Sequence, residues 1–494
     1  MDLITIFSDK ENDLLKDESR MSGYAQSISF PRSTEDVSQI LKSTDQKVTI
    51  QGNRTGLAGG AVPYGGHILN ITRMTKILSL EDNIVHCQAG LLLSDLTKHL
   101  KEFGLFLPPD PTEKSACLGG MAACNASGAR TLRYGPIRPW IIGLTVVMSD
   151  GEIIEINRGE QFASGYDFTL ITKSGKKISS SLPKYEMPNV KNAAGLYIHK
   201  DMDLIDLFIG SEGTLGVITE LKLKLLSLPR RIAAVTSFFA TEKSALDFVD
   251  STRKSNINPA ALEYFDENSL EMLRTERQNN PSFIDLQELP ENYYSAVYIE
   301  IHASSKQEQD KMLSKISDLI VDCGGNSSHT WLAITPSDFD NLQYFRHATP
   351  EIVNLTIDRR RKEYPGLTKL GTDMAVPDNK LYDVMNLYRT DLEKANLEYV
   401  IFGHIGDNHV HVNIIPRNDA EYELGKALYL DWSRQIVSWG GTVSAEHGIG
   451  KFKINFLKMM YSEDDLNEMI RVKKLLDSKL RLNIGNLFEV GEAK

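Results

Sequence analysis

Apolar residues recur at helical spacing in several stretches of the chain. In the segment that starts at Thr34, the apolar side chains of Val37, Ile40 and Leu41 follow a Ser/Thr cap. This pattern predicts a helix over residues 34–43. The same spacing predicts helices in segments spread over the rest of the chain: Leu92–Phe103 (ended by Gly104), Gln307–Val321, Glu421–Trp439 and Ser462–Leu480.

Strand patterns lie between these helical segments. Residues 141–148 form an apolar run, and the turn residues 149–151 join it to the alternating segment 152–156, which predicts a β-hairpin. The residues from Val217 to Leu225 alternate between apolar and polar, as in a half-exposed strand. Further strands are expected at Val48–Ile50 and Val297–His302, with a broken strand over Tyr399–Ile415.

This mixture predicts the α+β class with more than one domain. A turn at Pro229 marks a first boundary, because a strand–helix–strand pattern begins after it and continues to about residue 415. We expect three units: residues 1–229, residues 230–440, and residues 441–494, with the last segment packing back against the first unit.

Composition narrows the possible functions. The chain has 494 residues and a net charge of −11, with no long basic block, which argues against nucleic acid as a partner. No apolar run reaches the roughly 18–20 residues that cross a bilayer, and the N-terminus does not resemble a secretory signal. The four cysteines include no Cys-x-x-Cys pair, so an iron–sulfur cluster within this chain is not expected. We therefore expect a cytoplasmic protein without a transmembrane segment.

Three glycine-rich loops stand out in the first 230 residues. Six of the sixteen residues in 51–66 are glycine, and further clusters lie in 108–135 and in 210–219. Glycine lets backbone amides turn inward and cradle a phosphate or pyrophosphate, and small residues let the backbone lie flat against a planar ring. The spacing fits neither the Rossmann fingerprint nor a P-loop. Three such loops in one unit are hard to explain as surface turns.

These loops resemble the FAD-binding domain of the vanillyl-alcohol oxidase/p-cresol methylhydroxylase (PCMH) superfamily. From about residue 25 to 490 the chain resembles its D-lactate, glycolate and D-2-hydroxyglutarate dehydrogenase branch. The resemblance implies a PCMH-type FAD-binding domain of two subdomains, and a cap domain with an antiparallel sheet and flanking helices. No His, Cys or Tyr falls within 51–60, so non-covalent FAD is expected. The segment 173–200 is longer than the same region in the shortest members of the family, and we assign it no role.

The resemblance assigns the cofactor to residues in all three loops. The expected FAD-binding residues are Gln51, Gly52, Asn53, Arg54, Thr55, Gly56, Gly59, Gly60, Pro109, Asp110, Gly119, Gly120, Ala123, Asn125, Ser127, Gly128, Tyr134, Gly135, Glu212, Gly213, Gly216, Val217 and Ile218.

Four of the 11 histidines fall within 44 residues, at His404, His409, His411 and His447. Imidazoles with the neighbouring Glu446 form a mixed N/O set suited to Zn²⁺, Mn²⁺ or Fe²⁺. In a strand, His409 and His411 would share a face, whereas His404 and His411 would point oppositely unless residues 406–408 bend the chain. These patterns leave both pairings open.

The family motif, Gly-His-x-Gly-Asp-Gly-Asn-x-His followed by Glu-His-Gly, selects one pairing. Matched by position, His404, His411 and Glu446 become the metal ligands and His447 the catalytic base. Zinc is the first expectation for the ion. This sequence has Asn408 and His409 where the motif has Gly and Asn, which bears on the turn or the substrate pocket.

Three polar residues are expected to bind the substrate. Arg346 occupies the segment where the family carries its substrate arginine, and a guanidinium binds a carboxylate bidentately. An ordinary salt bridge is the alternative role for Arg346. Lys369 is a weaker match, because it stands eight residues before Pro377 rather than six. Asn413 is a further hydrogen-bond donor.

The expected reaction is the oxidation of a D-2-hydroxy acid to the 2-oxo acid, with His447 as base and hydride transfer to flavin N5. By the resemblance, D-lactate is the leading substrate, followed by D-2-hydroxyglutarate and glycolate. Electrons would pass to a separate acceptor: an electron-transfer flavoprotein, an iron–sulfur subunit, a quinone or a cytochrome. That acceptor could hold the protein peripherally at a membrane. The alternatives are a zinc hydrolase, which leaves the glycine loops unexplained, and a flavin-binding electron-relay subunit, which does not need His447.

Overall fold

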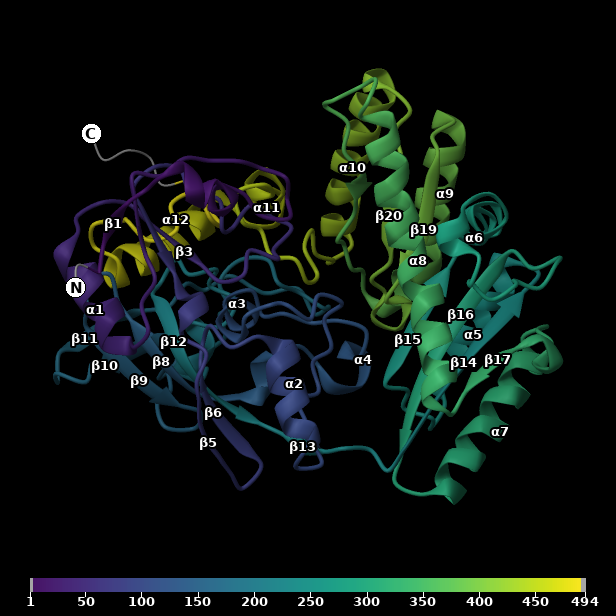
Figure 1. Ribbon diagram of the computed structural model, residues 1–494, viewed down its shortest axis with the longest axis horizontal. Helices are drawn as coiled ribbons and strands as arrows, with labels where there is room; N and C mark the ends of the chain where they lie inside the picture. The colour runs from purple at the N-terminus through teal and green to yellow at the C-terminus, as the bar shows by residue number, and fades with distance from the viewer. Residues whose placement is uncertain (1–2, 490–494) are drawn as a thin grey trace.

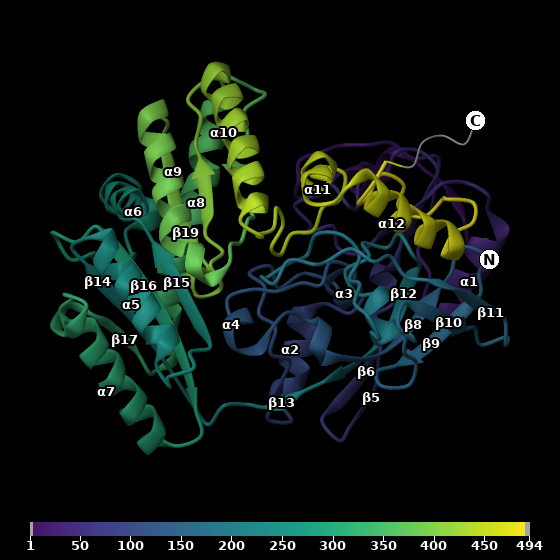
Figure 2. The same ribbon diagram turned by 180° about the vertical axis from the view of Figure 1, so that it is seen from behind.

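The structure is a computed structural model that describes residues 3–489. Two lobes lie side by side, joined by an extended segment after β13 (Figure 1). The N-terminal half of the chain forms the first lobe, and α11 (Ile454–Met460) and α12 (Glu463–Leu476) return to pack on it. The chain between β13 and α11 forms the second lobe, as the view from behind also shows (Figure 2).

The first lobe contains two main sheets. A four-stranded sheet has the order β1-β2-β4-β3, in which β4 pairs in parallel with β2 and with β3. A five-stranded antiparallel sheet has the order β5-β6-β12-β8-β9. Their strands are β1 (Thr5–Ile6), β2 (Ser27–Ser29), β3 (Val48–Gln51), β4 (His67–Asn70), β5 (Ile77–Glu81), β6 (Ile84–Gln88), β8 (Ile141–Val147), β9 (Ile153–Asn157) and β12 (Val217–Lys224).

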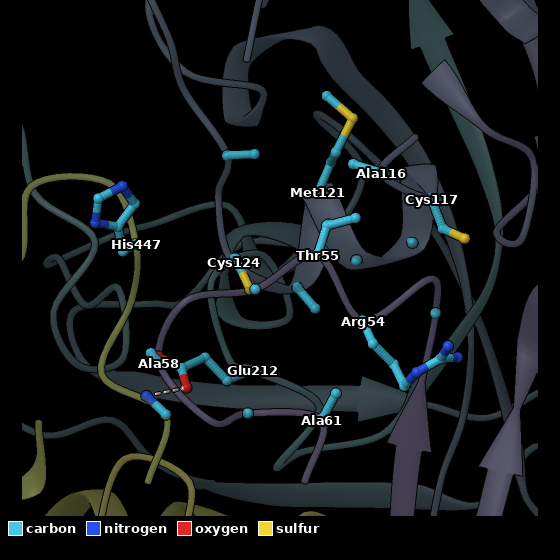
Figure 3. Close-up of a pocket in the computed structure, with 18 of the residues that line it drawn as sticks. Arg54, Thr55, Ala58, Ala61, Ala116, Cys117, Met121, Cys124, Glu212 and His447 are labelled. Carbon is cyan, nitrogen blue, oxygen red and sulfur yellow. Dashed lines mark hydrogen bonds between the residues drawn. The ribbon is translucent and has the colours of Figure 1, made fainter. Parts of the chain in front are cut away.

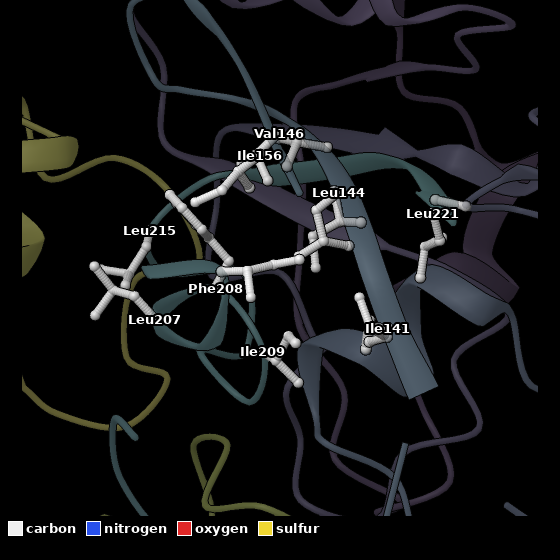
Figure 4. Close-up of a cluster of buried hydrophobic side chains, with 14 of the residues drawn as sticks. Ile141, Leu144, Val146, Ile156, Leu207, Phe208, Ile209, Leu215 and Leu221 are labelled. Carbon is white, nitrogen blue, oxygen red and sulfur yellow. The ribbon is translucent and has the colours of Figure 1, made fainter. Parts of the chain in front are cut away.

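Short helices and two small ribbons complete this lobe. The helices are α1 (Thr34–Ser43), α2 (Leu93–Lys101), α3 (Leu118–Ala123) and α4 (Thr131–Tyr134). The ribbons pair β10 (Asp167–Ile171) with β11 (Lys177–Ser181), and β7 (Leu105–Phe106) with β13 (Leu226–Ser227). Apolar side chains of β8, β9 and β12 pack with those of residues 204–215 in one buried cluster (Figure 4).

Residues 443–488 contribute to the same hydrophobic cluster as residues 37–225. Buried Leu457, Met469, Val472 and Leu476 from α11 and α12 belong to it. On this packing we propose the division into units that the sequence suggests, with the C-terminal segment completing the first lobe.

The second lobe is built on a seven-stranded antiparallel sheet with the order β17-β14-β16-β15-β19-β20-β18. Every residue of β15 and of β16 is buried, because helices cover both faces of the sheet. The strands are β14 (Arg231–Phe239), β15 (Ala261–Phe265), β16 (Ser295–Ala303), β17 (Trp331–Ala333), β18 (Leu370–Gly371), β19 (Tyr399–Gly403) and β20 (His411–Ile414).

Side chains that alternate along the strands enter two different cores. Residues such as Val235, Tyr264 and Ile299 pack with α5 (Glu242–Lys254), α7 (Lys306–Asp322), α9 (Leu381–Ala395) and α10 (Asp419–Ser438). On the other face, Phe265 and Tyr298 pack with α6 (Glu267–Asn279) and α8 (Pro336–Arg360). The α+β class and the antiparallel cap sheet expected from the sequence are therefore confirmed.

Most elements expected from the sequence begin and end within a few residues of their prediction. The helix predicted over residues 34–43 is α1, and Ser33 caps it by accepting a hydrogen bond from the Asp36 amide. The predicted hairpin is β8–β9. The broken strand is β19 and β20, interrupted by a 3-10 turn over Ile405–Asp407.

Among residues 3–489, no helix combines the length and the apolar character that spanning a membrane requires.

Candidate functional site

A single cavity connects the three glycine loops with the histidine cluster. Its walls come from the 50–61 loop, from residues 111–128, from 212–218, and from His404, Glu446 and His447. Its empty space is about 1500 Å³, open mouth included. Arg54 and His447 lie well apart in the close-up, with Thr55, Cys124 and Glu212 between them (Figure 3).

The first loop follows β3 and is held from within the protein. The side-chain amide of Gln51 donates hydrogen bonds to the carbonyls of Leu14 (2.7 Å) and Ala61 (2.8 Å), which closes the loop. Arg54 adopts the left-handed conformation, with φ of 60°. Within residues 3–489 its guanidinium has no hydrogen bond or ion pair, and burial lowers its pKa. An unpaired cation thus lies on the cavity wall.

The second loop presents helix α3 to the cavity. Gly119 and Gly120 both line the cavity, but they differ in their surroundings. A Cβ at Gly119 would lie 2.7 Å from the Cβ of Ala89, whereas a Cβ at Gly120 would meet no protein atom within 4 Å. Gly119 therefore permits close packing, and Gly120 leaves cavity space open.

The third loop carries Glu212, which ties the first lobe to the C-terminal segment. Its carboxylate accepts hydrogen bonds from the amides of Ile449 (2.6 Å) and Gly450 (2.7 Å). Burial raises the pKa of Glu212 to about 7, against the effect of these hydrogen bonds. Asn483 and Asn486 each donate a side-chain hydrogen bond to the Glu212 carbonyl and complete the wall.

The structure places fifteen of the expected FAD-binding residues on the cavity wall. They are Gly52, Asn53, Arg54, Thr55, Gly56, Gly60, Gly119, Gly120, Ala123, Ser127, Gly128, Glu212, Gly213, Gly216 and Ile218. The other eight do not line the cavity: Gln51, Gly59, Pro109, Asp110, Asn125, Tyr134, Gly135 and Val217.

Several residues of this second set have structural contacts instead. Asp110 pairs with Arg130 and Lys114, and the Oδ1 of Asn125 accepts a hydrogen bond from the Arg138 amide. The hydroxyl of Tyr134 lies 2.7 Å from Nδ1 of His302 in the cap sheet, so Tyr134 links the two lobes.

At the other end of the cavity, one oxygen of Glu446 faces three imidazoles. Its Oε1 lies 3.3 Å from Nε2 of His404, 3.5 Å from Nε2 of His411 and 3.6 Å from Nε2 of His447. The turn over residues 405–407 brings His404 and His411 together, as the family motif implied. Donor atoms of His404, His409, His411 and Glu446 form one group that could hold a metal ion.

Buried partners orient the two expected histidine ligands. Nδ1 of His404 lies 2.7 Å from Oε1 of Glu263, and Nδ1 of His411 lies 2.9 Å from the Thr372 carbonyl. Both Nε2 atoms are therefore free to face an ion, the usual arrangement of metal-binding imidazoles. Burial alone would lower the pKa of His404, but Glu446 and Glu263 outweigh it and raise that pKa to about 9.

His447 is held by a second carboxylate. Its Nδ1 lies 3.4 Å from Oδ2 of Asp373, which also accepts hydrogen bonds from the His447 amide (3.1 Å) and from Nζ of Lys453 (2.7 Å). Burial lowers the pKa of His447 to about 4, although Asp373 and Glu446 oppose this. The Nε2 of His447 is thus the basic atom that faces the cavity side of the cluster.

The three expected substrate residues do not line the cavity. Arg346 on α8 is partly buried, with 12% of its side chain exposed, and its Nη2 and Nε lie 3.0 Å and 3.3 Å from Oε2 of Glu263. Lys369 is half-buried beside Arg20, and Asn413 is buried on β20 next to Gly371. Arg346 therefore supports His404 through Glu263 in this structure.

Glu263, Asp373 and Lys191 belong to the site but were not expected from the sequence. Glu263 interrupts the apolar strand β15, and a carboxylate in a buried strand is a signal that could have indicated a partner. Asp373 had no such signal. Lys191 lies in the 173–200 segment, to which the sequence gave no role.

The donor sets at the two ends fit different groups. Open space at Gly120 and the unpaired Arg54 suit a large anionic cofactor with a planar ring. Separations of 3.3 and 3.5 Å between Glu446 Oε1 and two Nε2 atoms match ligands about 2.1 Å from a shared tetrahedral ion.

Two protein-family models match the chain. The model described as FAD binding domain matches residues 25–157, and the model described as FAD linked oxidases, C-terminal domain, matches residues 228–487.

Curated proteins with similar sequences include dehydrogenases and an oxidase subunit. The D-lactate dehydrogenase of Anaerostipes hadrus is 28% identical over 469 residues, covering 92% of this chain and 88% of the relative. The glycolate oxidase subunit GlcD of Bacillus subtilis is 26% identical over 472 residues, covering 93% and 88%. The mitochondrial D-2-hydroxyglutarate dehydrogenase of Danio rerio is 28% identical over 468 residues, covering 92% and 76%.

A similar fold occurs among solved structures. An alkyldihydroxyacetonephosphate synthase superposes with a TM-score of 0.68 at 16% identity, covering 98% of this chain and 82% of that protein. At this level of identity the likeness concerns the fold alone.

Proposed function

The chain belongs to the FAD-linked oxidases, and from that premise we propose that it oxidises a D-2-hydroxy acid, first of all D-lactate, to the 2-oxo acid with the help of a divalent metal ion. Family membership confirms the resemblance found in the sequence, and with it FAD as cofactor and oxidoreductase as enzyme class. D-2-hydroxyglutarate and glycolate are the next substrates to consider, because similar proteins carry their names.

One observation carries the proposal: the cavity lined by the three glycine loops ends at His404, Glu446 and His447. A flavin-binding relay subunit does not require a metal-binding group of imidazoles and a carboxylate at that place. A zinc hydrolase does not require the three loops. A 2-hydroxy acid dehydrogenase requires both.

The proposal gives each residue of the histidine–carboxylate cluster a role. His404, His411 and Oε1 of Glu446 would hold the ion, with Zn²⁺ the first choice and Mn²⁺ or Fe²⁺ alternatives. When bound, the ion would lower the pKa of the substrate hydroxyl and FAD would accept the hydride from Cα. Asp373 fixes the ring of His447, and Nε2 of His447 takes the hydroxyl proton.

Binding of the substrate carboxylate needs a cation or the ion itself. Arg346, Lys369 and Asn413 remain our proposal for substrate contacts, although Arg346 has Glu263 as its partner. The electrons would leave to a separate acceptor of the kinds named above, which the proposal does not specify further.

The test is an anaerobic visible spectrum of the purified protein before and after substrate. Bleaching of the flavin band near about 450 nm by D-lactate, and not by L-lactate, is the expected result. Bleaching by D-2-hydroxyglutarate or glycolate alone would change the substrate but keep the reaction. Persistence of the band with all three acids, in zinc-loaded or manganese-loaded protein, would reject the proposal.

A further inference from the structure

The ammonium of Lys191 lies between two members of the metal-binding group. Its Nζ is 2.8 Å from Oε2 of Glu446 and 3.2 Å from Nδ1 of His409. The Lys191 side chain is only 6% exposed, and it does not line the cavity. A buried ammonium at this point is an internal cation beside the place where the ion would sit.

The first consequence concerns Glu446. Its Oε2 accepts hydrogen bonds from Lys191 and, at 3.0 Å, from the hydroxyl of Ser127. The other oxygen, Oε1, faces the Nε2 atoms of His404 and His411. The two donors thus direct a single oxygen of the carboxylate toward the ion.

The second consequence concerns His409. Its donor atom lies within the same group as those of His404, His411 and Glu446, so by position it is a fourth ligand. Yet Nδ1 of His409 faces the ammonium of Lys191, and its Nε2 lies 3.2 Å from Oδ1 of Asp373. With Nδ1 accepting from Lys191, the ring has no lone pair left to offer an ion.

We propose that Lys191 is a positioning residue that keeps His409 and Oε2 of Glu446 out of the coordination sphere of the metal. The ion then has three protein ligand atoms, and its remaining positions stay open for the hydroxyl and carboxylate of the substrate. Three protein ligands are typical of catalytic zinc sites, and four of closed, structural ones. This inference rests on the proposed metal-assisted function and assigns a role to the 173–200 segment.

The test uses Lys191→Met, which keeps most of the length of the side chain but removes its charge and donors. The variant no longer repels the ion, and it leaves Nδ1 of His409 and Oε2 of Glu446 free to bind it. Zinc affinity, measured by competition with a chelator, should therefore rise about tenfold or more. Zinc K-edge X-ray absorption should show two imidazoles in the native protein and three in the variant. The rate of flavin reduction by substrate should fall, because the additional protein ligands occupy the coordination positions that the substrate needs.

Two further variants keep the inference testable. In Lys191→Met/His409→Asn the imidazole count should return to two, since the released ligand is absent. His409→Asn alone should change zinc affinity by less than about threefold, because His409 is not a ligand in the native protein. This single variant does not depend on whether the lysine variant folds.

The outcomes separate this inference from the function on which it rests. Native protein that binds zinc with three imidazoles, or a large loss of zinc affinity in His409→Asn, would overturn the role of Lys191 alone. A Lys191→Met variant with native affinity and two imidazoles would do the same. Native protein that binds no zinc, manganese or iron would overturn the metal-assisted function and this inference together.

Discussion

Asp373 holds His447 from two sides: its Oδ2 lies 3.4 Å from the Nδ1 of the ring and accepts a hydrogen bond from the His447 amide at 3.1 Å. Asp373 is fully buried, and His447 and Lys453 keep the pKa of its carboxyl well below the usual range despite that burial. The carboxylate thus orients the ring so that Nε2 points toward Glu446.

Asp373→Asn should therefore slow flavin reduction by substrate by about 10²-fold or more, because the amide can stabilise the other tautomer of His447. Substrate affinity and flavin content should stay close to native values. Stopped-flow reduction at several substrate concentrations measures the rate and the affinity separately. Lys453→Met is the matched control, since it removes another partner of Asp373 but leaves the contact with His447. Equal loss of rate in the control would contradict an orienting role for Asp373.

Metal removal should abolish flavin reduction by the hydroxy acid without bleaching or releasing the flavin. The ion's ligands lie at one end of the cavity, whereas the glycine loops lie at the other. Dialysis against a chelator, followed by addition of Zn²⁺ or Mn²⁺, should remove and restore the reaction. His404→Asn should behave as the chelated protein and resist restoration. Full activity after verified removal of the metal would show that no ion takes part.

Arg346 and Glu263 should act as one unit in stability. Removing one partner of a buried ion pair leaves the other charge uncompensated, so Arg346→Met and Glu263→Gln should each cost about 3–5 kcal/mol in the free energy of unfolding. The double variant should cost clearly less than the sum, which urea unfolding would measure. Both single variants should also weaken zinc binding, because Glu263 orients His404. A raised KM for substrate in Arg346→Met, beyond these losses, would support the proposed substrate contact of Arg346, whereas unchanged stability in both single variants would contradict the ion-pair role.

The two neighbouring glycines of α3 should respond in opposite ways to alanine. Gly120→Ala should keep or raise stability by up to about 1 kcal/mol, because alanine favours the helix and meets no protein atom, but it should lower FAD affinity. Gly119→Ala should destabilise the fold, since its Cβ would lie 2.7 Å from that of Ala89. Thermal unfolding and FAD titration of flavin-free protein distinguish the two effects. Unchanged FAD affinity in Gly120→Ala would place the cofactor away from α3.

Glu212 should make stability depend on pH near neutrality. Its pKa in the folded protein is about 7, above the ordinary value of 4.5 expected in the unfolded chain. Its contribution to stability is therefore fully present below pH 4.5 and is lost as the pH rises through 7, a change of about 3 kcal/mol. Urea unfolding at pH 5 and pH 8 should show this change in the native protein, and Glu212→Gln should lack it. The same pH dependence in both proteins would assign it to another group.

Local signals in the sequence predicted much of the fold. Val37, Ile40 and Leu41 lie at helical spacing, and all three are buried in α1. The turn residues 149–151 were sufficient for the β8–β9 hairpin. Such signals act within a few residues, so they do not depend on distant parts of the chain. The long helix α8 was not predicted, and its weakly amphipathic sequence, with Pro350 inside, explains why.

The residues of the site also fall into those that local sequence patterns indicate and those that they do not. The glycine loops, the clustered histidines and the Glu446–His447 pair could be recognised in the sequence, because those residue types and spacings are local. Family resemblance then chose His404 with His411, a pairing that the turn over residues 405–407 makes possible.

The distant side chains that complete the site could be identified from the fold alone. Glu263, Asp373 and Lys191 lie 141, 74 and 255 residues from the partners they contact, His404, His447 and Glu446. No local pattern encodes such separations. Glu263 meets His404 because β15 pairs with β19 in the cap sheet, whereas the contacts of Asp373 and Lys191 require the C-terminal segment to lie beside them. Burial there removes water from these charges, so each charge must find a partner, and those partners determine which atoms of the imidazoles and of Glu446 remain available for chemistry.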